Sequence, residues 1–399
     1  MTLLDDIAGV GTDPARGGYS RHGFDTAELE LREWFSAEAT RRGLDVTGDR
    51  NGNLWAWWGE PGDGAVVTGS HLDSVPGGGA FDGPLGVTSA LEAVDLLRSR
   101  GFRPAKPFAV VVFAEEEGGR FGVPCLGSRL LTGALDPDRA RRLTDPAGTT
   151  LADAARAAGI DPAGFGADPA ALARIGVFVE LHVEQGRGLV DLAAPVGVAD
   201  SILAHGRWRF SLSGQGNHAG TTLMADRVDP MLPAARLVLD ANRLVSDVEG
   251  ARATVGRIVP TPGGTNVIAS TVDVWLDVRA DDDERTRAVV DAITAAAADT
   301  ARGSGCGLTV TEESYSTAVT FDAALRDRLA AGLGGVPVLP TGAGHDAGVL
   351  AAHVPTAMLF VRNPTGISHA PAEHAEPVDC AAGAVALADV LADLAGPAS

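Results

Sequence analysis

The sequence predicts an α/β fold in which a mixed or parallel sheet is interrupted by a smaller α+β domain. Short, continuous apolar runs, typical of strands covered on both faces, alternate with amphipathic helical patterns. Between about residues 206 and 319 the pattern changes to half-exposed strands and two helices. The 399 residues also exceed the usual size of one hydrophobic core, so two domains are expected.

The elements of the larger domain follow from these patterns. A helix is predicted over residues 25–42, where apolar residues recur among charged ones and Asp25 can cap the first turn. An apolar stripe predicts a second helix over 85–97. Continuous apolar runs predict buried strands at 65–69, 108–114, 175–183 and 356–361.

The region between these strands predicts an inserted domain with a ferredoxin-like order, β-α-β-β-α-β. The expected strands are 207–213, 254–258, 271–279 and 308–312, and the expected helices are 229–244 and 281–301. We therefore predict a larger domain made of residues 1–206 and 321–399, and an insertion over 207–320.

The composition limits the possible partners and the compartment. Hydrophobic residues make up 45% of the chain, and the formal net charge is −20. A surface with this much negative charge repels phosphate backbones and anionic lipids. We therefore expect neither nucleic-acid nor membrane partners. The N-terminus has no signal-peptide pattern, no apolar run is long enough to span a membrane, and the three cysteines are widely separated. We expect a cytoplasmic protein without disulfides.

Histidines and carboxylates follow the predicted strands. His71 and Asp73 come directly after strand 65–69, and Asp82 lies in a glycine-rich loop that opens the next helix. Open α/β sheets bind ligands at the carboxyl ends of their strands. A His-x-Asp pair is also common as an ordinary structural pair. In the functional interpretation, His71 binds a metal and Asp73 holds the other nitrogen of its ring.

Three successive carboxylates, Glu115, Glu116 and Glu117, follow strand 108–114. They could form a solvated loop, but their position after a buried strand directs at least one of them towards the sheet. Buried carboxylates are unfavourable unless a cation neutralises them. Adjacent carboxylates also allow one to bind metal while its neighbour accepts a proton from water.

The remaining strand ends carry two further histidines. His182 lies on the same face of its strand as Glu180, and His369 follows the strand at 356–361. Mixed sets of histidine and carboxylate ligands suit Zn²⁺ or Mn²⁺, and a shared carboxylate permits two ions about 3.5 Å apart. Other polar side chains stand in loops or at strand ends where they could contact a ligand; they are His218, Asn266, Arg279 and His345.

These segments resemble the M20-type metallohydrolases, and in particular the branch of allantoate amidohydrolase, N-carbamoyl-L-amino acid hydrolase and β-ureidopropionase. The resemblance covers nearly the whole chain in order. It is carried by Gly-Ser-His-Leu-Asp-Ser-Val (69–75), Phe-Asp-Gly-Pro-Leu-Gly (81–86), Glu-Glu-Glu-Gly-Gly-Arg-Phe (115–121), Glu-Leu-His-Val-Glu-Gln-Gly (180–186), Asn-His-Ala-Gly-Thr-Thr (217–222), Gly-Ala-Gly-His-Asp-Ala (342–347) and Gly-Ile-Ser-His-Ala-Pro-Ala-Glu (366–373).

The resemblance implies a zinc-peptidase-like catalytic domain with an inserted lid that also forms a homodimer. It implies two divalent metal ions, Zn or Mn with Co or Ni as alternatives, and it gives Glu116 the role of general base. His218 would stabilise the oxyanion, and Gln185, Asn266, Arg279 and His345 would contact the substrate. The implied metal ligands are His71, Asp82 as the bridging residue, Glu117, His182 and His369.

The resulting hypothesis is hydrolysis of a ureido C–N bond in a small carboxylate, with release of ammonia and CO₂. Allantoate is the substrate that the resemblance favours. N-carbamoyl-L-amino acids and N-carbamoyl-β-alanine are the alternatives within this branch. An M20 peptidase or deacylase and a non-catalytic metal-binding protein are the other two interpretations. The segment 361–365 and Gly119 depart from the family pattern, which weakens the choice of substrate.

Overall fold

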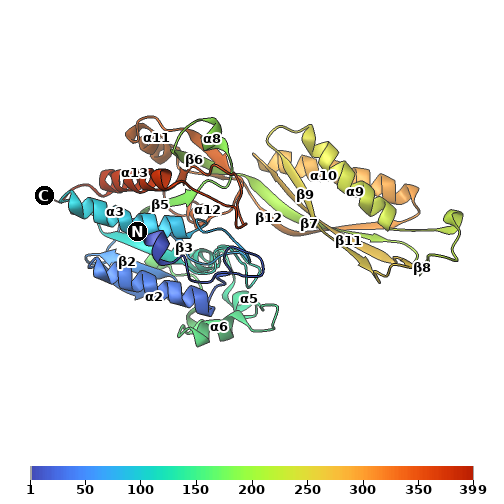
Figure 1. Ribbon diagram of the computed structural model, residues 1–399, viewed down its shortest axis with the longest axis horizontal. Coiled ribbons are helices and arrows are strands. Elements are labelled where there is room, and N and C mark those ends of the chain that lie inside the picture. The colour runs from blue at the N-terminus through green and yellow to red at the C-terminus, as the bar shows by residue number, and fades with distance from the viewer. Residues whose placement is uncertain (1, 399) are drawn as a thin grey trace. The chain divides into compact units, whose positions relative to one another are not determined.

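The computed structural model describes residues 2–398, which form two compact units. Unit 1 comprises Met1–Ser201 and Thr320–Ser399, and unit 2 comprises Ile202–Val319. The chain therefore leaves unit 1 once and returns to complete it (Figure 1). No helix among residues 2–398 is both long enough and apolar enough to cross a membrane.

A nine-stranded mixed sheet forms the centre of unit 1. Its main path runs β1-β2-β4-β3-β5-β15-β6-β13, and β14 pairs with β6. The four central strands β4, β3, β5 and β15 are mutually parallel, whereas β2 and β6 run antiparallel to their neighbours. The strands are β1 (Asp45–Gly48), β2 (Leu54–Trp58), β3 (Ala65–His71), β4 (Phe108–Phe113), β5 (Ile175–Val183), β6 (Val196–Ile202), β13 (Val319–Thr320), β14 (Val338–Thr341) and β15 (Thr356–Val361).

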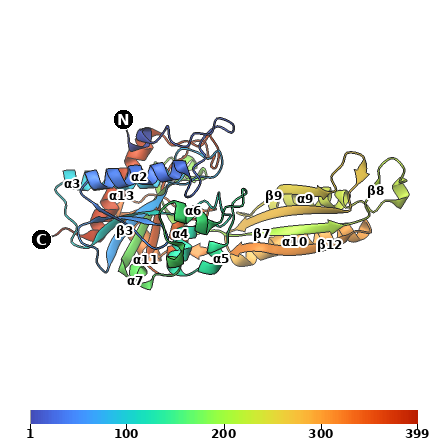
Figure 2. The same ribbon diagram turned by 90° about the horizontal axis from the view of Figure 1, so that it is seen from below.

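Helices cover this sheet on both sides (Figure 2). Apolar side chains of α2, α3 and α13 share one core cluster with the strands, and α4 to α6 build a smaller cluster. Asp25 caps α2 by accepting a hydrogen bond from the Glu28 N–H at 2.9 Å. The helices are α1 (Leu3–Asp6), α2 (Thr26–Arg41), α3 (Pro84–Ser99), α4 (Leu126–Thr132), α5 (Pro137–Arg141), α6 (Leu151–Ala157), η1 (Pro162–Gly164), α7 (Pro169–Arg174), α8 (Gly188–Asp191), α11 (Ala323–Gly332), α12 (Asp346–Leu350) and α13 (Pro377–Ala395).

Unit 2 is a four-stranded antiparallel sheet of order β12-β7-β11-β9, packed against two helices through its own core. A short hairpin, β8–β10, extends from it. Its elements are β7 (Ala204–Ser213), β8 (Asn217–His218), η2 (Met224–Asp226), α9 (Met231–Ser246), β9 (Arg252–Thr261), β10 (Val267–Ile268), β11 (Thr271–Ala280), α10 (Asp283–Gly303) and β12 (Gly307–Ser316).

The predicted α/β fold with a mixed sheet is confirmed. The structure places β5 and β15 at the predicted bounds. In unit 2 the four long strands and two helices follow one another in the order β-α-β-β-α-β, with the short strands β8 and β10 added between them. One detail was wrong, because His71 was expected directly after its strand. His71 is the last residue of β3 and His182 lies within β5, so the strands themselves fix both rings.

Candidate metal centre

The carboxyl ends of the four parallel strands bring the predicted site residues of unit 1 together. β3 ends at His71, β4 leads into Glu115–Glu117, and β5 carries His182. The loop after β15 carries His369, so the returning part of the chain completes the group. Parallel neighbours end at the same sheet edge, which explains why residues so distant in sequence meet there.

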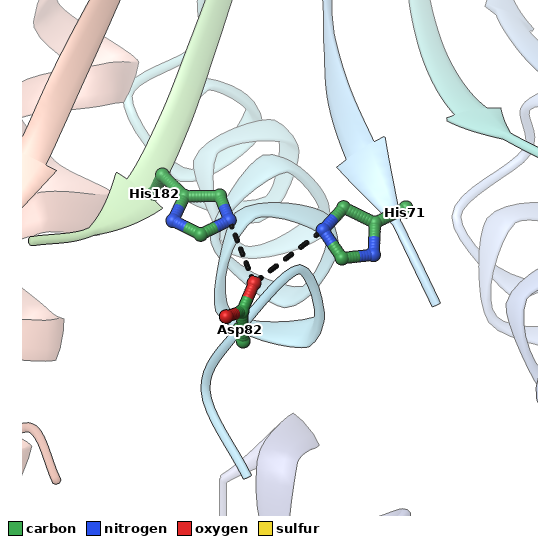
Figure 3. Close-up of side chains that lie close together, drawn as sticks. All are labelled: His71, Asp82 and His182. Carbon is green, nitrogen blue, oxygen red and sulfur yellow. Dashed lines mark ion pairs between the residues drawn. The ribbon is translucent and has the colours of Figure 1, made fainter. Parts of the chain in front are cut away.

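Asp82 stands between three histidines. Its Oδ1 lies 3.2 Å from His182 Nε2 and 3.6 Å from His71 Nε2, as Figure 3 shows. Its Oδ2 lies 3.4 Å from His369 Nε2, and that same nitrogen lies 3.4 Å from Glu117 Oε2. The two oxygens of one carboxylate therefore face two different groups of side chains.

A glycine makes room for this arrangement. Gly83 has φ +83° and precedes α3, and a Cβ added there would lie 2.4 Å from His71 Cε1. The His71 ring therefore packs directly over the backbone of the loop that carries Asp82. This contact couples the position of the ring to that of the carboxylate.

The three successive glutamates have different surroundings. The carboxylate of Glu115 points away from the histidines and accepts hydrogen bonds from the N–H groups of Gly23, Arg120 and Phe121. Glu116 is 5% exposed, and its Oε2 lies 3.6 Å from His71 Nε2. Glu117 faces His369. Only the second and third carboxylates therefore belong to the candidate site.

Asp73 contacts the His71 ring mainly through its backbone oxygen. The nearer contact of His71 Nδ1 is the backbone oxygen of Asp73 at 3.0 Å, while the carboxylate is 3.6 Å away. That carboxylate accepts hydrogen bonds from the backbone N–H groups of Glu116 and Glu117, both at 3.0 Å. Asp73 therefore fixes the backbone of the acidic loop, which spacing alone does not reveal.

Burial and like charges dominate the electrostatics of this cluster. Burial raises the pKa of the Glu116 and Glu117 carboxyls well above their usual range, and neighbouring carboxylates add to the effect. Burial alone would lower the pKa of His71, but Glu116, Asp73 and Asp82 raise it well above its usual value. Positive charge is therefore favoured at the imidazole nitrogens that face Asp82.

The buried polar atoms of this cluster fit a bound cation. Within residues 2–398, His71 Nε2, His182 Nε2 and Glu117 Oε1 are buried without a hydrogen-bond partner. Orphaned buried polar atoms are costly, and imidazole and carboxylate are the donors that Zn²⁺ and Mn²⁺ prefer. The donor atoms form two groups compatible with a metal ion, His71–Asp82–His182 and Asp82–Glu117–His369.

Gln185 and His345 lie beside the same cluster. Gln185 Nε2 donates to Asp82 Oδ2 at 2.9 Å and to Ser368 Oγ at 3.0 Å. The His345 ring lies 4.5 Å from the His182 ring between centroids, and burial lowers its pKa well below the usual value. Burial therefore favours the neutral form of the His345 ring. It also forms a third close group with Glu180 and His182, in which Glu180 already accepts hydrogen bonds from Ser70 and Ala347.

Two polar neighbours of the cluster were missed from the sequence. The Cys125 thiol donates to Glu116 Oε1 at 3.3 Å, and Ser368 Oγ lies 3.1 Å from Asp82 Oδ2. Ser368 stands next to His369 inside a motif already singled out, so its position was a usable signal. Cys125 had no such signal, because it reaches Glu116 through a left-handed backbone turn with φ +53°.

His218, Asn266 and Arg279 belong to unit 2. The Gly220 N–H donates to His218 Nδ1 at 3.0 Å, so the ring hydrogen of a neutral His218 is on Nε2. Arg227 holds the same loop by donating to the backbone oxygens of Ala219 at 2.6 Å and Thr222 at 3.2 Å. The geometry therefore presents His218 Nε2–H as a hydrogen-bond donor.

The hairpin and β11 position the other two residues. The Asn266 backbone oxygen accepts the Ala219 N–H at 3.0 Å, which ties Asn266 to the His218 loop. Arg279 donates to both carboxylate oxygens of Asp277, at 2.9 and 3.3 Å. Asp277 therefore orients the guanidinium within the sheet.

A mixed α/β sheet whose parallel strand ends carry paired histidine and carboxylate groups has the donor atoms that a metal-dependent hydrolase needs. The comparisons with known proteins give the family. A model described as peptidase family M20/M25/M40 matches residues 67–393, so the chain belongs to that family.

Relatives and solved structures narrow the type within this family. An N-carbamoyl-L-amino acid amidohydrolase of Geobacillus stearothermophilus is 36% identical over 390 residues, which cover 96% of this chain and 95% of the relative. An allantoate amidohydrolase of Escherichia coli (strain K12) is 32% identical, over 98% of this chain and 96% of the relative. A hydantoinase/carbamoylase family amidase from Burkholderia vietnamiensis has a TM-score of 0.86 at 31% identity, over 98% of this chain and 95% of that one.

The chain is therefore a metal-dependent amidohydrolase of the M20 carbamoylase and allantoate amidohydrolase type. Enzymes of this type act on C–N bonds other than peptide bonds.

Proposed function

We propose that the protein hydrolyses the ureido C–N bond of a small carboxylate with two divalent ions, Zn²⁺ or Mn²⁺ first and Co²⁺ or Ni²⁺ as alternatives. The observation that carries this proposal is the position of Asp82, whose Oδ1 faces His71 and His182 while its Oδ2 faces His369. One carboxylate shared in this way suits a two-ion site. The proposed ligands are His71, Asp82, Glu117, His182 and His369.

Glu116 is the proposed general base. Bound divalent ions polarise a carbonyl oxygen and lower the pKa of water to about 7. The Glu116 carboxylate accepts the proton of the attacking water and returns it to the leaving nitrogen, and the carbamate that remains decomposes to CO₂ and ammonia. The burial of Glu116 and the distance of 3.6 Å between its Oε2 and His71 Nε2 support this role beside the proposed ligands.

The substrate contacts are assigned to both units. In this proposal His218 donates from Nε2 to the oxyanion, because the Gly220 N–H occupies its Nδ1. Asn266 and Arg279 bind the substrate carboxylate, and Gln185 and His345 contact the substrate in unit 1. A planar guanidinium suits this task because it binds a carboxylate through two hydrogen bonds.

Allantoate and an N-carbamoyl-L-amino acid are the two substrates to test first. The sequence motifs favour allantoate, and the 36% identity to an N-carbamoyl-L-amino acid amidohydrolase favours the second. We would measure ammonia release from both, and from N-carbamoyl-β-alanine and ureidoglycolate, with Mn²⁺, Zn²⁺ and Co²⁺. A dipeptide and an N-acetyl amino acid serve as controls. Cleavage of these controls without ammonia release from any ureido compound would contradict the proposal.

We also propose that unit 2 forms a homodimer. Its helix α9 exposes Leu232 and Leu239, which are 62% and 64% exposed. Exposed leucines on one helix favour association with an apolar partner surface. Light scattering on the native protein should give twice the mass of one chain. The double variant Leu232→Asp/Leu239→Asp should give the mass of a single chain. A wild-type protein that stays monomeric at high concentration would contradict this assignment.

A further inference from the structure

Glu373 is a buried carboxylate that connects two parts of the candidate metal centre without belonging to either group of donor atoms. It is 4% exposed, and it lies in the loop after β15. Among the described residues it forms no ion pair, so its partners are all neutral hydrogen-bond donors. Burying such a carboxylate is unfavourable unless its oxygens are well occupied, and the contacts below show how they are.

One oxygen of Glu373 holds the Asp82 loop. Glu373 Oε1 accepts the N–H of Asp82 at 2.9 Å and the N–H of Phe81 at 3.1 Å, across 291 and 292 residues of sequence. Gly79 leaves the space for this carboxylate, because a Cβ added at Gly79 would lie 2.2 Å from Glu373 Oε1 and 2.6 Å from Glu373 Cβ. The carboxylate is therefore packed tightly under the segment that presents Asp82.

The other oxygen of Glu373 holds the His369 loop. Glu373 Oε2 accepts a hydrogen bond from Ser368 Oγ at 3.0 Å, and the Glu373 N–H donates to the Ala370 oxygen at 3.0 Å. His369 itself has φ +56°, a left-handed conformation that is unfavourable for a residue with a side chain. Such strain persists only where surrounding contacts fix the backbone, and Glu373 supplies contacts on both sides of His369.

The two groups of donor atoms differ in how firmly the fold holds them. His71 and His182 extend from neighbouring strands and are almost fully buried. His369 extends from a strained loop, and its side chain is 50% exposed. Removing a contact beneath the loops should therefore displace the His369 group more than the strand histidines.

We propose that Glu373 is a positioning residue that sets the cation affinity of the Asp82–Glu117–His369 group, and affects the His71–Asp82–His182 group far less. The inference rests on the proposed two-ion site. Residues that orient metal ligands typically change metal affinity by about 10–100-fold when they are removed. Glu373 would thus make the second ion the one most sensitive to changes in the loop after β15.

The test is a calorimetric titration of metal-free protein with Mn²⁺ alone. Wild type should bind two ions. In Glu373→Ala, the Mn²⁺ affinity of the His71–Asp82–His182 group should stay within about threefold of wild type. The Mn²⁺ affinity of the Asp82–Glu117–His369 group should fall by about 10–100-fold. Glu373→Gln should lose less, because its amide oxygen can still accept the two N–H groups. Glu376→Gln is the matched control, since Glu376 is exposed and contacts His374 rather than the cluster, and it should bind both ions as wild type does.

Two results would overturn the inference. One is a folded Glu373→Ala protein that binds both ions with wild-type affinity, and the other is an equal loss at both sites. If Glu373→Ala does not fold, Ser368→Ala decides, because it removes the hydroxyl that faces Glu373 Oε2, together with the contacts of that hydroxyl to Asp82 Oδ2 and Gln185 Nε2, and should weaken the second ion selectively. Unchanged affinities in that variant would equally overturn the inference. A wild-type protein that binds no Mn²⁺, Zn²⁺ or Co²⁺ would instead contradict the proposed function.

Discussion

Replacing Glu116 by glutamine tests the assignment of the general base. The amide has nearly the same shape as the carboxylate and can still accept the Cys125 thiol hydrogen bond now made to Oε1. The backbone of Glu116 remains held by Asp73. Since burial and nearby carboxylates raise the pKa of Glu116 well above its usual range, removing the charge should not destabilise the fold. We therefore expect a folded protein that keeps its bound metal.

The expected loss of turnover is large. General acid–base catalysis contributes about 10²–10⁴-fold. Three carboxylates of the cluster have other contacts, Asp82 and Glu117 with histidines and Asp73 with backbone N–H groups. The loss should therefore approach about 10³–10⁴-fold, or about 4–5.5 kcal/mol of transition-state stabilisation.

The assay combines ammonia release at saturating substrate with metal analysis of the same sample. Glu115→Gln is the matched control, because its amide group would face the N–H groups of Gly23, Arg120 and Phe121. That change should cost about 1–3 kcal/mol of folding stability, seen as a lower Tm, with little change in kcat. Turnover of Glu116→Gln within threefold of wild type would refute the base assignment. Loss of metal from that variant would show that Glu116 is a ligand.

Three further substitutions test other parts of the site. Asp82→Asn should lose both ions on dialysis, as measured by metal analysis, and retention of two ions would exclude a shared ligand. Gly83→Ala should strain the backbone by about 1–2 kcal/mol and displace His71, with a loss of metal affinity of about tenfold or more in calorimetry. Wild-type affinity there would mean that the ring can move without cost. Arg227→Ala removes the donors to Ala219 and Thr222, so kcat/KM should fall about 10–100-fold while metal content stays constant. Unchanged kcat/KM would show that the His218 loop needs no such support.

The central strands could be predicted because each signal is local. The apolar runs of β5 and β15 are long enough to be read directly, and Asp25 marks the start of α2 by a side-chain cap within one turn. The edge strand β1, its neighbour β2 and the short helices α5 to α7 carry weaker patterns and were not predicted. Their formation depends on packing against strands and loops that are distant in sequence.

The grouping of the candidate site residues followed from topology, since parallel strand ends meet at one sheet edge. What the sequence could not provide was the supporting hydrogen bonds. Asp73 accepts hydrogen bonds from the backbone N–H groups of Glu116 and Glu117, which follow β4. Glu373 accepts a hydrogen bond from the N–H of Asp82, which is 291 residues away in the sequence. Such contacts depend on loop conformations, including the left-handed backbone of Cys125 and His369, for which no spacing rule exists.

The most direct test of the account is one titration read out in two ways. Chelated protein would receive increasing Mn²⁺, and each sample would be assayed for bound ions and for ammonia release from allantoate and an N-carbamoyl-L-amino acid. We predict two ions per chain, and ammonia release that appears only as they bind. Ammonia release by the metal-free protein would contradict the account, as would a fully loaded protein that cleaves a dipeptide but no ureido compound.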